Sequence, residues 1–317
     1  MKVLVTDKMA QEAIDVLNDA GHDVTYEELD ADTLLKEIPN YDALMVRSRT
    51  KAIKEVVEAG ANGNLKVIGR AGIGVDNIDI KVAAEHKIPV VNSPTGATAS
   101  VAELAIGHML ALSRHIARAD KTMKKGEWAK KQLKGFELGG KTLGLIGTGN
   151  IGKHTANLAM CFGMKVVGYD PFISKEDMKK DGIEKIEELS DLMAKSDYIS
   201  LHLPHIDATH HIVNDEMISK MKSSAYLINC ARGGTVDEKA LYDALKEGEI
   251  AGAALDVFES EPPKENLFSE LDNVVMTPHI GANTKEGQIK AGTVCAAQIN
   301  KVLNGEDPDY CVNKKFL

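Results

Sequence analysis

The segment TLGLIGTGNIG joins a strand-like apolar run to three glycines, Gly147, Gly149 and Gly152. This spacing is typical of a buried parallel strand that turns tightly into a helix and leaves its backbone open to a pyrophosphate. We expect the helix to begin near Asn150, so that its free N–H groups and its positive dipole end face the phosphates. A second apolar run, MKVVGYD, ends in Asp170, an acid that can accept hydrogen bonds from an adenosine ribose and would repel a 2′-phosphate. The sequence therefore predicts a dinucleotide site that takes NAD rather than NADP.

The rest of the chain alternates between apolar runs and helical patterns. From KVLVT to PVVNS this alternation predicts βα units and a parallel sheet over residues 1–97. The first turn of that domain has no glycine fingerprint, so we do not expect it to bind the nucleotide. Six strand-like runs then follow from GLIG to NVVMTP, which match a doubly wound dinucleotide fold. The last long helical segment, TKEGQIKAGTVCAAQINKVLNGE, has no strand after it, so we expect it to return to the first domain.

A helical pattern of about 25 residues links the two predicted domains and begins at ATASVAELAIGHML. A helix of that length usually crosses between domains or pairs with a partner subunit. The tryptophan, Trp128, follows it in a polar loop rich in lysine and glycine. Contact with another subunit and local packing beneath the loop are both open explanations for its position.

Length and composition limit the class of protein. The 317 residues are enough for two domains of ordinary size, and no apolar run reaches the roughly 18 residues that a membrane span needs. A net charge of −9 argues against general binding of nucleic acid. The amino terminus, MKVLVTD, is strand-like, so we expect no signal or transit peptide. Four cysteines without CxxC spacing indicate reduced thiols and a cytoplasmic protein: Cys161, Cys230, Cys295 and Cys311.

Polar residues that follow predicted strands are the first candidates for chemistry, because ligands bind outside the carboxyl ends of parallel strands. AYLINC leads to Arg232, GAALDV leads to an acidic stretch with Glu259 and Glu261, and NVVMTP leads to His279. An arginine can hold a carboxylate bidentately, and a histidine can exchange a hydroxyl proton near neutral pH. An acid can orient the histidine ring. The pattern predicts hydride transfer at a carbon that bears a hydroxyl, with either glutamate as the acid.

The segment VRSRT places Arg47, Ser48 and Arg49 after another predicted strand, ALMV. On a regular extended segment the two arginines would point to the same face and could both reach one anion, such as a phosphate. If the chain has already turned there, one of them is only a surface charge.

Metal chemistry has no support in the sequence. His210 and His211 lie in the polar loop HIDATHHIVN, with no carboxylate pair at ligand spacing. We therefore expect these two histidines to be solvated and expect no metal site.

Five motifs together, GLIGTGNIG, YDP, NCARGGTVDE, ALDVFESEPP and TPHIGANT, closely resemble the D-isomer-specific 2-hydroxyacid dehydrogenases. VRSRTK, KVIGRAGIGVDNID and PVVNSPTGATASVAELAIGHMLALSR are similar to the D-3-phosphoglycerate dehydrogenase branch of that family. The similarity covers nearly the whole chain. It implies an α/β protein with two domains. A Rossmann-type doubly wound parallel sheet, residues 98–282, would be inserted in a discontinuous flavodoxin-like substrate domain, residues 1–97 and 283–317.

The resemblance also implies roles for individual residues. Arg232 would anchor the substrate, Glu261, directly before Pro-Pro, would be the partner of the base, and His279 would be the acid and base. NAD would contact Asp256 beside the nicotinamide amide and a larger set around the glycine turn: Gly147, Gly149, Asn150, Ile151, Gly152, Asp170, Leu203, Cys230, Ala231 and Ala282. The substrate would contact Arg47, Ser48, Arg49, Gly72, Ile73 and, from the other subunit, Lys130.

The resemblance implies oxidation of D-3-phosphoglycerate, the first step of serine biosynthesis, by a cytoplasmic homodimer or homotetramer. A glyoxylate or hydroxypyruvate reductase, or a D-lactate dehydrogenase, would differ only in the side chains that meet the substrate tail. A non-catalytic NAD-sensing co-repressor is the alternative from another class. Many members of the branch carry a further C-terminal regulatory domain. Because this chain ends at Leu317, we do not expect serine feedback.

Overall fold

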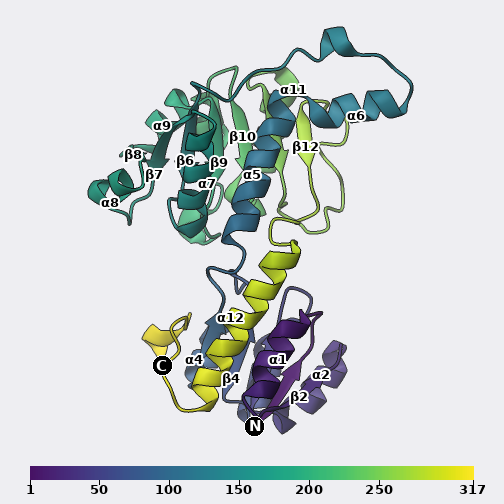
Figure 1. Cartoon of the computed structure of the whole chain (residues 1–317), viewed down its shortest axis with the longest axis vertical. Helices are drawn as coiled ribbons and strands as arrows, with labels where there is room; N and C mark the ends of the chain where they lie inside the picture. Colours follow the sequence, from purple (N-terminus) through teal and green to yellow (C-terminus); the bar gives the residue numbers. More distant parts are fainter. The chain divides into compact units, whose positions relative to one another are not determined.

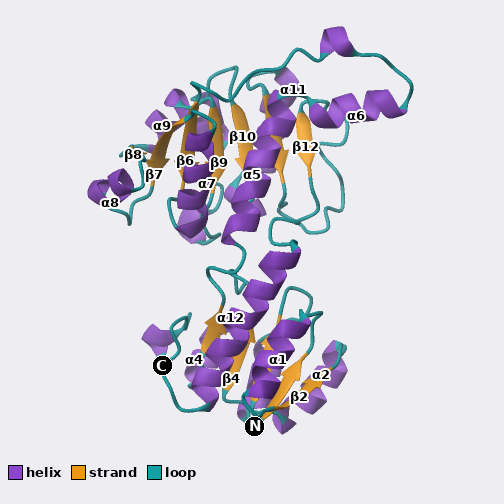
Figure 2. Cartoon of the chain, in the orientation of Figure 1, coloured by secondary structure: helices purple, strands orange, loops and turns teal.

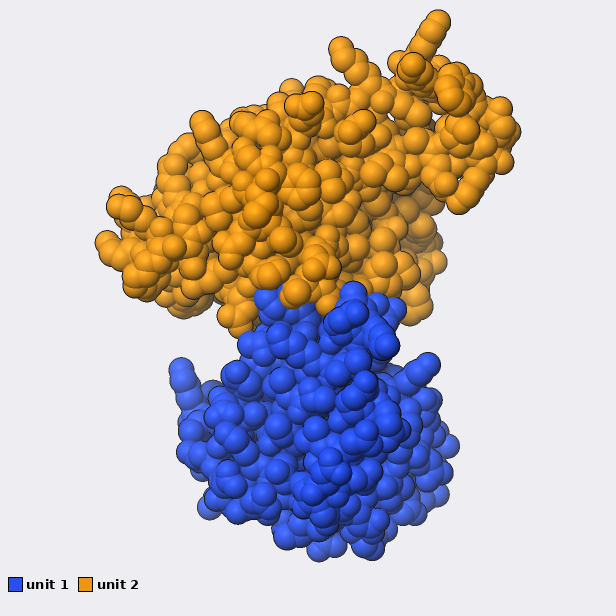
Figure 3. Space-filling model, in the orientation of Figure 1, with its two compact units in different colours: residues 1–98, 282–317 blue, residues 99–281 orange.

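The computed structural model describes residues 1–317 and divides into two compact units (Figure 3). One unit comprises residues 1–98 and 282–317, and the other comprises residues 99–281. Both units are built on parallel sheets flanked by helices (Figures 1 and 2). No helix combines the length and the apolar character that crossing a membrane requires.

The first unit contains a five-stranded parallel sheet in the order β2-β1-β3-β4-β5. This is the strand order of flavodoxin-like folds. The strands are β1 (Lys2–Val5), β2 (Asp23–Tyr26), β3 (Ala43–Val46), β4 (Val67–Arg70) and β5 (Val90–Asn92). The helices are α1 (Gln11–Asp19), α2 (Ala31–Glu37), α3 (Lys54–Ala61), α4 (Ile80–Glu85) and α12 (Lys285–Leu303).

Alternate residues of these strands enter two separate cores, as the period of two in an extended chain requires. Val3 and Val5 pack with α1 and α12 on one face, whereas Leu4 packs with α2, α3 and α4 on the other. Figure 1 shows α12 running alongside α1. A Cβ at Gly69 would lie 2.5 Å from the Ile299 side chain, so a glycine in β4 allows α12 to pack closely on the sheet.

The second unit contains a seven-stranded parallel sheet in the order β12-β11-β10-β9-β6-β7-β8, the doubly wound arrangement of dinucleotide-binding folds. Its strands are β6 (Thr142–Ile146), β7 (Lys165–Tyr169), β8 (Glu184–Lys185), β9 (Tyr198–Leu201), β10 (Tyr226–Asn229), β11 (Gly252–Leu255) and β12 (Val274–Met276). The prediction of six strands missed β8, because a two-residue strand carries no apolar period. The helices after the glycine turn are α7 (Asn150–Cys161), α8 (Lys175–Lys180), α9 (Leu189–Lys195), α10 (Asp215–Ser219) and α11 (Glu238–Glu247).

The prediction of one long helix between the domains was wrong. The segment forms α5 (Thr98–Ser113) and α6 (Ile116–Lys124), and the residue between them, His115, has a left-handed backbone with φ 54°. The Ser113 carbonyl, which a continuing helix would use, accepts the Phe136 N–H at 2.9 Å instead. A distant segment of chain therefore ends α5, without a proline or glycine at the break.

Candidate active site

The turn between β6 and α7 has the shape of a phosphate cradle. Gly147 has φ +91°, and a Cβ there would lie 2.5 Å from the His202 carbonyl oxygen. A Cβ at Gly152 would lie 2.3 Å from the Gly147 carbonyl oxygen, whereas one at Gly149 would meet no atom within 4 Å. Two glycines are thus required by packing and the third leaves backbone exposed to a ligand. Asn150 and Ile151 open α7 directly after it, as a dinucleotide phosphate site requires.

Asp170 follows β7, and its carboxylate is held in place by the glycine turn. Oδ2 accepts the Thr148 N–H at 2.9 Å, and Oδ1 accepts the Phe172 N–H at 3.0 Å. The side chain is half-buried. A carboxylate held in this position can accept hydrogen bonds from the adenosine ribose hydroxyls and would repel the 2′-phosphate of NADP. The residues of this unit therefore fit NAD.

His279 and Glu261 form a close pair. His279 Nδ1 lies 2.6 Å from Glu261 Oε2, and the second oxygen, Oε1, accepts the Phe258 N–H at 3.1 Å. Burial raises the pKa of Glu261, but the hydrogen bonds from His279 and Phe258, with the nearby charge of Arg232, lower it below its usual value. The carboxylate is therefore ionised at neutral pH, and it orients the imidazole with Nδ1–H toward itself.

Glu259, the other acid that the sequence left open, has a different partner. Its Oε1 lies 2.8 Å from His211 Nε2, in a pair whose side chains stay partly open to solvent, with His211 31% and Glu259 42% exposed. The Glu259 N–H is donated to Glu238 Oε1 at 2.7 Å. Burial, followed by the charges of Glu259 and Glu261, raises the pKa of Glu238, despite a backbone hydrogen bond that lowers it. No group of three or more metal-binding side chains occurs.

Arg232 lies just beyond β10, on a backbone fixed by its neighbours. Its carbonyl accepts hydrogen bonds from Asn229 Nδ2 at 2.9 Å and from the Thr235 hydroxyl at 2.6 Å. Its Nη1 donates to the Ala231 carbonyl at 2.7 Å. A Cβ at Gly233 would lie 2.0 Å from the Phe258 carbonyl, so this turn packs directly on the loop that carries Glu261.

Asp256, Cys230 and Ala231 are buried beyond the ends of β11 and β10. Asp256 accepts the N–H groups of Ile280 and Gly281, each at 2.8 Å. These bonds hold the start of the segment that follows His279. Leu203 lies half-buried after β9, and Ala282 is exposed where the chain returns to the first unit.

Sequence reasoning missed two residues of this region, His108 on α5 and Thr277 after β12. His108 Nε2 lies 3.2 Å from Thr277 Oγ1, and Thr277 Oγ1 lies 2.5 Å from Asp256 Oδ1. The signal available in the sequence was a single imidazole among the small and apolar residues of AELAIGHMLAL.

In the first unit the Arg-Ser-Arg segment is not a continuing strand. Strand β3 ends at Val46, and Ser48 and Arg49 lie in a bend, so the same-face geometry of an extended segment does not apply. Arg49 Nε lies 3.4 Å from Asp7 Oδ1 and 3.8 Å from Glu28 Oε2, and its Nη1 donates to the Leu29 carbonyl at 3.3 Å. Its side chain is still 48% exposed, which leaves part of the guanidinium accessible to an anion.

The other substrate candidates belong to different units. In the first unit, Gly72 has φ +154° and its carbonyl accepts the Ser93 N–H at 2.9 Å, while the Ile73 carbonyl accepts Asn92 Nδ2 at 2.6 Å. Lys130 lies in the second unit, exposed at the start of the short 3-10 turn Lys130–Gln132.

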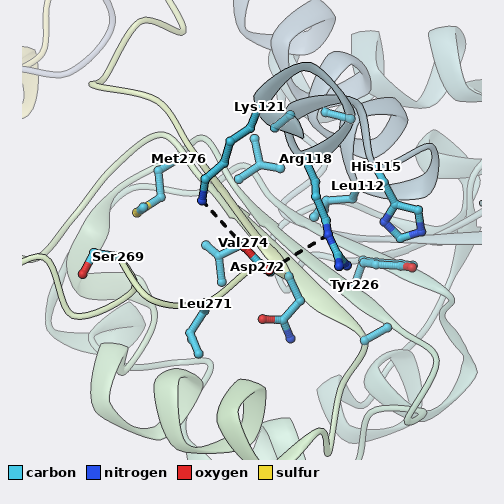
Figure 4. Close-up of a pocket in the computed structure, with 15 residues that line it drawn as sticks. Leu112, His115, Arg118, Lys121, Tyr226, Ser269, Leu271, Asp272, Val274 and Met276 are labelled. Carbon is cyan, nitrogen blue, oxygen red and sulfur yellow. Dashed lines mark ion pairs between the residues drawn. The ribbon is translucent and has the colours of Figure 1, made fainter. Parts of the chain in front are cut away.

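A separate hollow of ≈ 210 Å³ lies among α5, α6 and the edge strand β12 (Figure 4). Arg118 and Lys121 of α6 both reach Asp272, at 4.0 and 3.8 Å, over an apolar floor that includes Leu112 and Val274. None of the residues predicted for catalysis lines it. It lies beside β12, the edge strand of the sheet.

The fold agrees with comparisons to known proteins. Residues 106–281 match the NAD binding domain of the D-isomer specific 2-hydroxyacid dehydrogenases. The chain belongs to the D-isomer specific 2-hydroxyacid dehydrogenase family, and the unit of residues 99–281 contains its NAD-binding domain.

Three relatives show how the chain stands within the family. It is 50% identical to the D-3-phosphoglycerate dehydrogenase of Methanocaldococcus jannaschii over 99% of its own length, and it spans 59% of that relative. It is 49% identical to the hydroxypyruvate reductase of Thermotoga maritima, over 95% of its own length and 98% of that protein. A solved glyoxylate reductase from Paecilomyes thermophila superposes with a TM-score of 0.89 at 28% identity and covers 99% of each chain.

Proposed function

We propose that this protein oxidises a D-2-hydroxy acid with NAD, and that its substrate is D-3-phosphoglycerate, converted to 3-phosphohydroxypyruvate. The observation that carries the proposal is the 2.6 Å pair of His279 and Glu261 near Arg232, in a unit with an NAD-binding turn. This combination supplies a proton acceptor, a counter-charge and a carboxylate anchor for one carbon centre.

The residues divide the work of the reaction. Arg232 holds the substrate carboxylate, and His279 Nε2 takes the proton of the C2 hydroxyl. The ionised Glu261 accepts Nδ1–H and stabilises the imidazolium that forms. NAD bound at the glycine turn would supply the acceptor for the hydride that leaves C2. In the reverse direction the imidazolium returns the proton to the carbonyl oxygen.

The phosphate specificity rests on Arg47, Ser48, Arg49 and Lys130. The identity to the Methanocaldococcus D-3-phosphoglycerate dehydrogenase supports the choice of substrate and, with it, a role in serine biosynthesis. The proposed cytoplasmic location rests on the four cysteines without CxxC spacing. Because Arg49 already forms an ion pair with Asp7, the substrate phosphate would compete with the Asp7 carboxylate for the guanidinium.

The test compares NADH formation from D-3-phosphoglycerate, D-glycerate and D-lactate. Arg49→Ala and Lys130→Ala should raise KM for D-3-phosphoglycerate by about tenfold or more, as expected for a lost charged hydrogen bond, and change KM for D-glycerate much less. Lys131→Ala and Arg49→Lys are the matched controls. Equal weakening of both substrates, or a preference of the unaltered protein for an unphosphorylated acid, would refute the phosphate assignment.

Reduction of hydroxypyruvate or glyoxylate is the second candidate. Two observations favour it: the internal contacts of Arg49, and the identity to a hydroxypyruvate reductase of nearly the same length. In that case the same variants would leave hydroxypyruvate reduction close to its parental rate.

We propose further that the protein forms a homodimer through α6 and the loop that follows it. The support is a set of exposed apolar side chains along this stretch, Ile116, Met123, Trp128 and Phe136, of which Trp128 is 78% exposed. Exposed apolar patches of this kind mark interaction surfaces. Sedimentation at micromolar concentration should give the mass of a dimer, and Trp128→Glu should shift it toward the monomer. A monomer in the unaltered protein would refute this assembly.

A further inference from the structure

A buried chain of hydrogen bonds crosses the second unit beneath the candidate site. It runs from Cys230 Sγ to His108 Nδ1 over 3.5 Å, from His108 Nε2 to Thr277 Oγ1 over 3.2 Å, and from Thr277 Oγ1 to Asp256 Oδ1 over 2.5 Å. Cys230, His108 and Asp256 are 7%, 3% and 1% exposed. The chain joins α5 to the ends of β10, β11 and β12, the strands that also carry Arg232, Glu261 and His279.

The protons in this chain can be placed from one end. Thr277 Oγ1 donates to Asp256 Oδ1, and the same carboxyl group accepts two backbone N–H groups, so the single hydroxyl proton of Thr277 is used there. The Thr277 oxygen is then an acceptor for His108 Nε2–H. With its proton on Nε2, the neutral ring accepts at Nδ1, and the Cys230 thiol is the donor there.

The surroundings favour this arrangement. Burial lowers the pKa of His108, although Asp256 opposes the shift, so the ring is neutral at physiological pH. Burial also raises the pKa of Cys230, and the charge of Asp256 adds to the shift, so the thiol keeps its proton. Every donor in the chain therefore has one acceptor, and the direction of the bonds is fixed.

This chain of hydrogen bonds also determines which carboxylate oxygen of Asp256 can still accept a hydrogen bond from a ligand. Oδ1 accepts from Thr277 and from the Ile280 N–H, whereas Oδ2 accepts only from the Gly281 N–H. Oδ2 thus retains acceptor capacity for an amide N–H of a ligand. The orientation of the carboxylate depends on Thr277, and the orientation of Thr277 depends on His108.

We propose that His108 is a positioning residue for the nicotinamide end of NAD: through Thr277 it holds Asp256, and through the thiol it holds Cys230. The inference rests on the proposed function only in that Asp256 and Cys230 contact NAD. His108 does not itself touch the reacting atoms.

The test uses pairs of variants that keep one bond of His108 and lose the other. His108→Gln can present an amide N–H near the Nε2 position, and His108→Asn can present an acceptor near the Nδ1 position. Thr277→Val removes the hydroxyl, and Thr277→Ser retains it. NADH affinity is measured by fluorescence titration without substrate, so the result does not depend on which hydroxy acid is oxidised.

We expect His108→Asn and Thr277→Val each to weaken NADH binding by up to about tenfold, the upper end for a neutral hydrogen bond such as His108–Thr277 and the lower end for a bond to a carboxylate such as Thr277–Asp256. His108→Gln and Thr277→Ser should stay within about threefold of the parent. The double variant His108→Asn/Thr277→Val should be no weaker than Thr277→Val alone, because both changes break the same connection. A packing defect would give additive losses with no rescue by glutamine. In the unaltered protein, nitrogen NMR of the imidazole should detect the proton on Nε2.

A ring proton on Nδ1, or equal NADH affinity in all variants, would overturn the positioning role and leave the proposed reaction standing. If the unaltered protein does not oxidise D-3-phosphoglycerate but the NADH affinities of the variants are as expected, the proposed substrate is wrong and the positioning role of His108 stands. If the unaltered protein failed to bind NADH, both would fall.

Discussion

The two units are alike at the amino edges of their sheets. In each unit, an aspartate directly before a neighbouring strand accepts the first N–H of the first strand. Asp42, before β3, accepts from Lys2 of β1, and Asp197, before β9, accepts from Thr142 of β6, both at 2.8 Å. Each aspartate also pairs with a lysine, Lys66 or Lys222, at 2.9 Å. The same device thus anchors the start of both parallel sheets.

At the carboxyl edges the two units differ. The first βα turn of the second unit contains Gly147 and Gly149 and presents backbone to a ligand. The corresponding turn of the first unit contains Asp7, which is 2% exposed and binds the Arg47 N–H, Thr50 and Arg49 of its own chain. Two parallel sheets with different strand orders thus use their first βα turn for different purposes. The residues of the turn decide whether that edge suits a phosphate or braces its own loops.

The largest effect is expected where the second unit carries chemistry. His279→Ala should lower turnover by about 10²–10⁴-fold, the usual contribution of general acid–base catalysis. NADH binding should persist, because His279 is separate from the glycine turn. Stopped-flow hydride transfer and fluorescence titration measure the two quantities. A variant with parental turnover would mean that the proton passes through another group.

Replacing the aspartate of each carboxyl edge sharpens the contrast between the units. Asp7→Ala should destabilise the protein by about 3 kcal/mol, because several buried donors lose their acceptor. Asp170→Ala should change stability far less, but it should raise KM for NAD and narrow the preference over NADP. Denaturant unfolding and initial rates with both cofactors test this. Equal use of both cofactors by the unaltered protein would contradict the assignment of Asp170.

The two neighbouring glutamates provide a smaller and more specific test. In Glu261→Gln the negative charge beside His279 is lost, so the protonated imidazole is less stable. Oxidation needs the unprotonated ring, and the acidic limb of its pH profile should move to lower pH. Glu259→Gln is the matched control and should leave the limb in place, because Glu259 binds His211. A shift in the Glu259 variant alone would reverse the assignment.

The smallest effect is expected at the amino edges, and it should be the same in both units. Burial raises the pKa values of Asp42 and Asp197, but hydrogen bonds from a backbone N–H and a lysine outweigh it and hold both below the usual 3.8. A carboxyl group whose pKa is lower in the folded state than in the unfolded state stabilises the protein at any pH above its unfolded-state pKa. That stabilisation is lost as the pH falls through the folded-state pKa. Asp42→Asn and Asp197→Asn should each cost about 1 kcal/mol at pH 7. The cost should begin to shrink as the pH falls through the usual value of 3.8 and should vanish only below the lower pKa of the folded state. A cost independent of pH would show that the charge has no role.

Local sequence determined the features that depend on short stretches of chain. Glycine spacing predicted the turn after β6, since positive φ and close backbone approach restrict the residue that can stand there. Apolar alternation predicted the parallel sheets and put Arg232, Asp256 and His279 just beyond strand ends, where β10, β11 and β12 indeed stop.

Only the tertiary structure decided the pairings. The pattern of strand ends left both Glu259 and Glu261 open as partners for His279, and only the family resemblance favoured Glu261. In the structure the loop conformation assigns one glutamate to each histidine. Arg49 pairs with Asp7, which lies 42 residues before it in the sequence, and His108 contacts Cys230, which lies 122 residues after it. Such contacts depend on how whole elements pack, because a hydrogen bond is decided by distances of a few tenths of an ångström that no local pattern of residues encodes.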